Sequence, residues 1–158
     1  MTTPALMFSV TGTPRPLPRP RFVRGRRMPV SIADPKAKLW KLAVERAVDE
    51  MMRNSGLPGW ISGPVRVDMV FCMPTPQADR WGQPHTAKPD LDNVAKMVCD
   101  CMERAGALPR GDSRVSMGEM SKVWAERGGV YVTMRPATTS RPMPTTAPAP
   151  SWLASDTA

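Results

Sequence analysis

Acidic residues and one lysine cluster in the segment Lys88-Pro-Asp-Leu-Asp-Asn-Val-Ala-Lys-Met-Val-Cys-Asp100. Asp90 directly precedes a helical pattern of apolar residues and therefore suits a helix N-cap. Asp92, Lys96 and Asp100 follow at successive i, i+4 positions, so a helix would present all three on one face. The N-terminus of a helix favours ionised carboxylates, and Mg²⁺ binds through a few carboxylates, several waters and a substrate phosphate. The pattern therefore predicts a site for a divalent cation next to a phosphate.

A further acid lies downstream of this helical pattern. The segment Gly106-Ala-Leu-Pro-Arg-Gly-Asp-Ser113 brings Asp112 just ahead of a strand predicted from Val115. An acidic residue at a strand edge can fold back beside the helix start, which would place three carboxylates near one lysine. The alternative is that the first aspartate is a plain cap and the i, i+4 residues form ordinary surface ion pairs. Spacing alone leaves both interpretations open.

A dense run of arginine lies near the N-terminus, and no acidic residue precedes Asp34. Prolines are interleaved with the arginines and prevent a regular helix. Such a run could be no more than a solvated surface, but guanidinium groups match phosphate oxygens well, so we expect contact with DNA phosphates. The arginines concerned are Arg15, Arg19, Arg21, Arg24, Arg26 and Arg27. Clustered aspartates beside this basic surface indicate a nuclease-like site.

Composition agrees with a polyanionic partner. Lys and Arg number 22 against 14 Asp and Glu, which gives a net charge of +8 and a pI near 10.1. No apolar run approaches the roughly 18 residues of a membrane span, and no apolar signal region follows a basic start. We therefore expect a soluble, cytoplasmic protein without a membrane partner.

Other kinds of site are disfavoured. His85 is the single histidine, so a serine or cysteine triad would depend on it, and its polar, Pro-rich surroundings predict a solvated loop residue. Cys72, Cys99 and Cys101 lack the CxxC spacing of a structural zinc site. We expect them to be reduced residues of the core or of helices.

Periodicity predicts the elements that must position these residues. The expected order is a strand at 6–10, a helix at 35–53 behind an Asp34-Pro35 cap, a strand from 65 to 74, a polar loop at 75–88, a helix at 91–105, and strands at 115–124 and 129–134 joined by a hairpin turn at 125–128. In the first helix, the residues expected to pack on the core are Leu39, Leu42, Ala43, Ala47, Val48, Met51 and Met52. From residue 136 the sequence is rich in Pro, Thr, Ser and Ala. This composition predicts a disordered tail at 136–158 after one domain at 1–135.

Several short motifs occur in a fixed order along the chain. They are Gly12-x-Pro14 with Arg19-Pro-Arg21, then Pro89-Asp-x-Asp-Asn-x-x-Lys96 with Asp100, then Ala105-Gly106, and finally Asp112-Ser113 before a strand. This order resembles the RusA family of Holliday junction resolvases over roughly residues 6–135. The helical motif is fairly specific, because it combines Asp, Asp, Asn, Lys and Asp in one short helix with a distant acid.

The resemblance implies roles for individual residues. Asp90, Asp92 and Asp112 match the family's acidic catalytic residues and would bind the metal, and Lys96 matches the lysine that the family needs for cutting. Two more matching residues, Asn93 and Asp100, would support the helix start and orient the lysine. The family commonly has a double aspartate before the strand, whereas this chain has Gly111-Asp112 in a loop that is one residue longer.

The resemblance also implies an activity and a fold. The expected function is Mg²⁺-dependent endonuclease action, with Mn²⁺ able to substitute, that resolves Holliday junctions by paired nicks during DNA recombination and repair. The expected partners are a four-way DNA junction and a second copy of the chain, in a bacterial cell or a phage-infected host. The expected fold is α/β, a single domain with a small mixed β-sheet packed with helices. Two alternatives stay open, namely a non-catalytic basic DNA-binding accessory and a nuclease for flaps, forks or duplex DNA.

Overall fold

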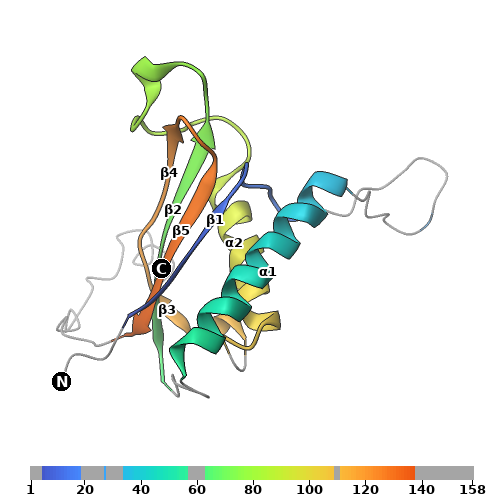
Figure 1. Cartoon of the computed structure of the whole chain (residues 1–158), viewed down its shortest axis with the longest axis vertical. Coiled ribbons are helices and arrows are strands. Elements are labelled where there is room, and N and C mark those ends of the chain that lie inside the picture. Colours follow the sequence, from blue (N-terminus) through green and yellow to red (C-terminus); the bar gives the residue numbers. More distant parts are fainter. Residues whose placement is uncertain (1–4, 19–26, 28–33, 57–62, 109–110, 138–158) are drawn as a thin grey trace, which may run out of the picture.

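The computed structural model describes residues 5–18, 27, 34–56, 63–108 and 111–137 (Figure 1). The elements are β1 (Leu6–Thr11), α1 (Pro35–Ser55), β2 (Val65–Pro74), the 3₁₀ turn η1 (Ala78–Arg80), α2 (Leu91–Arg104), the 3₁₀ turn η2 (Asp112–Arg114), β3 (Val115–Met117), β4 (Met120–Ala125) and β5 (Gly129–Pro136). A mixed five-stranded sheet carries the two helices, which confirms the expected α/β fold. In the described part of the chain, no helix is long and apolar enough to cross a bilayer. Of the predicted tail at 136–158, Pro136 instead ends β5, and residues 138–158 lie outside the described residues.

Strand β2 is the centre of the sheet. It pairs antiparallel with β5 on one side, and β5 pairs antiparallel with β1. On its other side β2 pairs in parallel with β3 and β4. The hairpin predicted across 125–128 is therefore wrong, since β2 lies between β4 and β5. The connection instead crosses the end of β2, where Thr75 N–H donates to Ala125 O and Gly12 N–H to Gly128 O.

The single strand predicted at 115–124 is divided into β3 and β4. At the break, a Cβ on Gly118 would overlap the carbonyl oxygen of Val67, so the close approach of the two backbones requires glycine. The pairing resumes where Met69 N–H donates to Glu119 O at 2.8 Å. An irregular register at Val65 and Arg66 accompanies the break.

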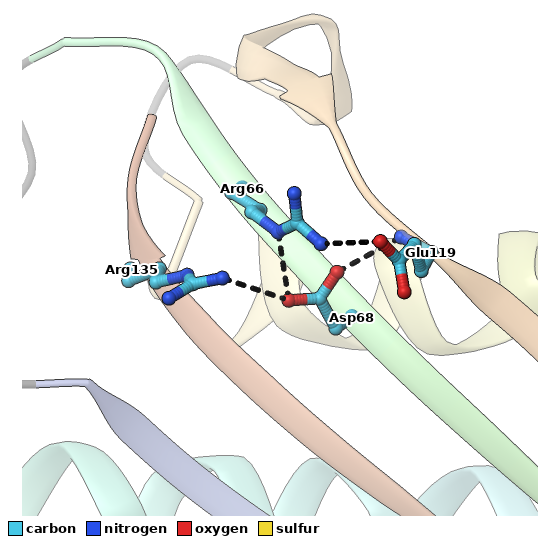
Figure 2. A network of polar contacts seen from close by, with 4 residues as sticks. All are labelled: Arg66, Asp68, Glu119 and Arg135. Carbon is cyan, nitrogen blue, oxygen red and sulfur yellow. Dashed lines mark hydrogen bonds and ion pairs between the residues drawn. The ribbon is translucent and has the colours of Figure 1, made fainter. Parts of the chain in front are cut away.

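A charged network braces this irregular part of the sheet (Figure 2). The Arg66 guanidinium contacts Asp68 Oδ2 at 2.9 Å and Glu119 Oε1 at 3.0 Å, while Glu119 N–H donates to Asp68 Oδ1 at 2.9 Å. Arg135 of β5 approaches the same Asp68 oxygen at 3.7 Å. Burial works against ionisation of Asp68, but the hydrogen bonds from Arg66 and from Glu119 N–H outweigh it and lower the pKa of the carboxyl. The network therefore ties β2 and β5 to the residue directly before β4, and it is structural.

Both helices pack on one side of the sheet, as Figure 1 shows. The inward residues of β2 alternate with outward ones, and the core is built on Val67, Met69 and Phe71. Helix α1 buries Ala37, Trp40, Val44, Val48 and Met51. Leu39 and Leu42, which were expected to pack inward, are 68% and 40% exposed. The buried face of α1 is therefore rotated by part of a helical turn from the predicted one.

The ends of α1 follow their sequence signals. The Asp34 carboxylate accepts a hydrogen bond from Lys36 N–H at 3.0 Å, and Pro35 occupies the first turn. Gly56 closes the helix with φ +62°, a conformation that other residues rarely adopt. The start of α1 is therefore firmly placed, which matters because it borders the cleft described below.

The loop at 75–88 packs along β4, and His85 is buried within it. Gly82 N–H donates to Trp124 O, Trp124 N–H to Gln83 O, and His85 N–H to Lys122 O, at 2.9, 2.9 and 2.8 Å. His85 is 7% exposed, and its ring lies 4.0 Å from the Trp124 ring, measured between centroids. The expectation of a solvated histidine is thus wrong, because backbone pairing with β4 carries this polar segment into the protein.

The buried His85 should make stability depend on pH. Burial, followed by the charge of Lys122, lowers the pKa of His85 from its ordinary value of 6.5. In the described structure, its buried Nδ1 has no hydrogen-bond partner. The unfolded chain therefore takes up a proton first, and the free energy of unfolding should fall as the pH drops from about 7 toward about 5. Urea unfolding at several pH values would measure this slope.

His85→Phe is the matched variant, because it keeps an apolar ring against Trp124 and removes the titrating group. The slope between about pH 7 and 5 should disappear, while stability at neutral pH should be retained. Equal slopes in both proteins would show that another group titrates in this range.

Candidate active site

The first predicted site residue, Asp90, stands at the N-cap of α2. Its backbone oxygen accepts from Val94 N–H at 3.2 Å, but its side chain makes no capping hydrogen bond. Both carboxylate oxygens instead accept from Lys88 Nζ, each at 2.8 Å. The Asp90 side chain is 47% exposed. Asp90 is thus a half-exposed carboxylate that already holds a cationic group on both oxygens.

Lys96 forms the second part of the site. Its Nζ lies 3.3 Å from Asp100 Oδ1, one helical turn further along α2, and 3.6 Å from Asp112 Oδ2. Asp112 begins η2 and lies beside Lys96 on the side of α2, whereas it was predicted to lie beside the helix start. The hydrogen bond to Asp100, followed by the charges of Asp100 and Asp112, raises the pKa of Lys96. The lysine therefore stays protonated, and 58% of its side chain is exposed.

A cleft of about 620 Å³ lies between the loop after β1 and the start of α2. Arg15 and Leu17 line it from the loop, and Lys88, Asp90 and Asn93 line it from the segment around the helix start. Residues at the start of α1 complete the wall. The cleft places basic side chains from two distant segments beside two acidic residues, Asp34 and Asp90. Such an arrangement suits a DNA phosphate with a cation beside it.

The structure places the predicted residues in two groups. Asp90, Asn93 and Arg15 line the cleft, whereas Asp112 and Asp100 meet at Lys96. Asp92 lies exposed on the first turn of α2. Arg27 is exposed. The remaining predicted DNA contacts lie outside the described residues, namely Arg19, Arg21, Arg24 and Arg26.

The donors suit a hard divalent cation, because Asp90, Asp92 and Asp112 supply carboxylate oxygens that are at least partly exposed. Asp90 shows this capacity by holding the Lys88 ammonium on both oxygens. Over the described residues, however, no group of three or more His, Cys, Asp or Glu side chains is arranged to hold one ion. Asp90 is instead paired with Lys88, and Asp112 with Lys96.

Sequence reasoning missed the role of Lys88. It lies two residues before Asp90 in Lys88-Pro89-Asp90 and is 84% exposed in its ion pair. The signal was its charge next to the first acid of the motif. The three cysteines are free, as expected, with Cys99 and Cys101 buried in α2. Burial raises the pKa of the Cys99 thiol to about 11, which keeps that thiol protonated and unreactive near neutral pH.

The family model described as endodeoxyribonuclease RusA matches residues 11–135. The chain belongs to the RusA endodeoxyribonuclease family. A search of the curated proteins found no match. The RusA match spans the cleft, α2 and η2, so it covers every site residue described above. Membership confirms the resemblance seen in the sequence and makes this chain a nuclease by family.

Proposed function

We propose that the chain is a divalent-metal-dependent endonuclease that resolves four-way DNA junctions as a homodimer. The observation that carries the proposal is the cleft of this RusA-family chain, where Arg15 and Lys88 flank Asp90 at the start of α2. A four-way junction offers two equivalent strands, and a two-fold symmetric dimer would present two equivalent sites. Residues 1–135 would form the endonuclease domain, and 136–158 a tail outside it.

Asp90, Asp92 and Asp112 would hold the metal ion, with Mg²⁺ as the physiological choice and Mn²⁺ able to substitute. When bound, the ion would polarise the scissile phosphate and make a bound water more acidic. The attack of water on phosphorus would break the P–O3′ bond, and the proton would pass to O3′. The products would be a 5′-phosphate and a 3′-hydroxyl.

The other residues of the site act on the DNA. Arg15 and Lys88 border the cleft and would bind phosphates beside the scissile one. Lys88 can do this by moving from the Asp90 carboxylate to a phosphate oxygen, since most of its side chain is exposed. Protonated Lys96 would stabilise the negative charge that develops on the reacting phosphate or the leaving oxygen. Asp100 would hold that lysine in place, and Asn93 would support the helix start.

The proposal is tested with one labelled four-way junction and with a flap, a fork and a linear duplex of matching sequence. Each is incubated with the purified chain in Mg²⁺ or in EDTA. We expect paired symmetric nicks in the junction when Mg²⁺ is present, and no nicks in EDTA. Faster cutting of flaps or forks than of the junction would show that those structures are the preferred substrate. If no DNA is cut at all, the chain would better fit a non-catalytic DNA-binding accessory.

Binding is followed in the same experiment, without metal. Because arginines and lysines would displace counterions from the DNA, junction affinity should fall by at least about tenfold between roughly 50 and 200 mM salt. An affinity that barely changes would contradict the phosphate contacts proposed for Arg15 and for the other arginines between residues 15 and 27.

A further inference from the structure

Lys122 of β4 contacts the segment that leads into Asp90. Its ammonium group donates to Ala87 O at 2.6 Å and also to Pro89 O. Ala87 and Pro89 are the third and first residues before Asp90 in the sequence. The lysine therefore holds the backbone on both sides of Lys88, the residue that pairs with the Asp90 carboxylate.

The backbone of Lys122 holds the same loop at another point. Its carbonyl oxygen accepts from His85 N–H at 2.8 Å. Lys122, a single residue of β4, thus contacts the chain at His85, Ala87 and Pro89, in the last residues before α2 begins. Lys122 is itself fixed by the pairing of β4 with β2, where it stands opposite Phe71 in the core strand.

We propose that Lys122 is a positioning residue that fixes the Asp90 carboxylate relative to the sheet. The inference rests on the proposed role of Asp90 as a metal-binding residue. The chain from residue 84 to residue 89 contains Pro84 and Pro89, which lack backbone N–H groups, so this segment has fewer donors with which to anchor itself. The ammonium group supplies donors from outside and satisfies two carbonyl oxygens at once. Without it, Asp90 would start α2 from a loosely held backbone.

A displaced metal ligand has a large effect on an enzyme, since a shift of about 1 Å can lower a rate by about a hundredfold. In the described contacts, Lys122 does not bond to the Asp90 side chain. It acts through the backbone carbonyl oxygens of Ala87 and of Pro89, the latter being a residue that lines the cleft. Its loss should therefore weaken the response to Mg²⁺ while leaving the basic residues of the cleft able to bind DNA.

Three variants test the proposal in the full chain. Lys122→Met removes the ammonium and keeps the apolar stem, while Lys122→Arg keeps donors and charge. Lys41→Met is the matched control, because that lysine lies on α1 and pairs with Glu45 at 3.8 Å. Should Lys122→Met fail to fold, Lys122→Leu, which also removes the donors, takes its place and is judged by the same outcomes.

The first measurement is hydrogen exchange of the free protein, without metal or DNA. In Lys122→Met the amides of His85 and Val94, which donate to Lys122 O and Asp90 O, should exchange about tenfold faster than in the wild type, with α1 unchanged. Lys122→Arg and Lys41→Met should exchange like the wild type. If these exchange rates are unaltered in Lys122→Met, then Lys122 does not act as a clamp, that is, its bonds to Ala87 O and Pro89 O do not hold this segment in place.

The second measurement is the Mg²⁺ concentration that gives half-maximal cleavage. We expect a rise of at least about tenfold in Lys122→Met, recovery in Lys122→Arg, and metal-free DNA affinity within about threefold of the wild type. A purely structural lysine would lower the melting temperature without moving the Mg²⁺ dependence, which would overturn the positioning role. If the wild type cut no DNA in Mg²⁺, the proposed function would fail, whereas the exchange measurement would still decide on the clamp.

Discussion

Replacing Asp92 by asparagine is expected to reduce DNA cleavage by at least about a hundredfold and to leave metal-free DNA binding intact. The change keeps the side-chain volume and a hydrogen-bond acceptor but removes one negative charge from a group proposed to hold a divalent cation. Asp92 is exposed on the first turn of α2, so folding should be little affected. Affinity for the junction should hold or improve, because one carboxylate no longer repels the phosphates.

Glu103→Gln is the matched control for Asp92→Asn. Glu103 is an exposed acid in the last turn of the same helix, so the substitution makes the same change of charge away from the cleft. Its cleavage rate should stay within about twofold of the wild type. Single-turnover cleavage in Mg²⁺ and junction binding in EDTA separate the two effects. An Asp92→Asn protein that cuts within a few fold of the wild type would remove Asp92 from the site and require a metal model built on other carboxylates.

Replacing Lys96 by methionine should also lower cleavage by at least about a hundredfold, the range expected for a lost stabiliser of transition-state charge. Lys96 stays protonated between Asp100 and Asp112, and more than half of its side chain is exposed toward solvent. Metal-free DNA affinity should fall by no more than about threefold, since the lysine is proposed to act mainly in the transition state. The melting temperature should change little, because exposed ion pairs contribute little to stability.

The alternative for Lys96 is an ordinary surface ion pair. Lys41→Met breaks a comparable i, i+4 pair with Glu45 on α1 and should leave cleavage unchanged. Asp100→Asn should give an intermediate loss, since it frees Lys96 on one side while Asp112 remains beside it. If Lys96→Met behaves like Lys41→Met, the Lys96 contacts are structural and the proposed chemistry must use another cation, with Lys88 the nearest candidate.

Much of the site could be predicted from the sequence, because it depends on local spacing. The helix at 91–104 and the strand at 65–74 follow from apolar periodicity, which does not require a distant partner. The i, i+4 arrangement of Lys96 and Asp100 is a property of any α-helix. A return of Asp112 toward the helix was also predicted, but beside the helix start. It lies instead beside Lys96, and among the described residues the expected convergence of three carboxylates is not present.

Only the tertiary structure decided which surfaces and strands meet. Alternation indicates a strand but not its neighbour, so the pairing of β4 and β5 with opposite edges of β2 was missed. The helical stripe of α1 likewise could not show that Trp40 and Val44 face the sheet while Leu39 points to solvent.

The same limit applies to the loop before α2. Its composition is polar and rich in proline, which predicts solvent exposure. Hydrogen bonds to β4 nevertheless bury His85, and they bring the Lys122 side chain into contact with the segment that leads to Asp90. Those contacts join residues more than 30 positions apart. Local patterns record what a segment can form by itself, whereas the hydrogen-bond partners of this loop exist only once β2 has paired with β4 and the sheet is complete.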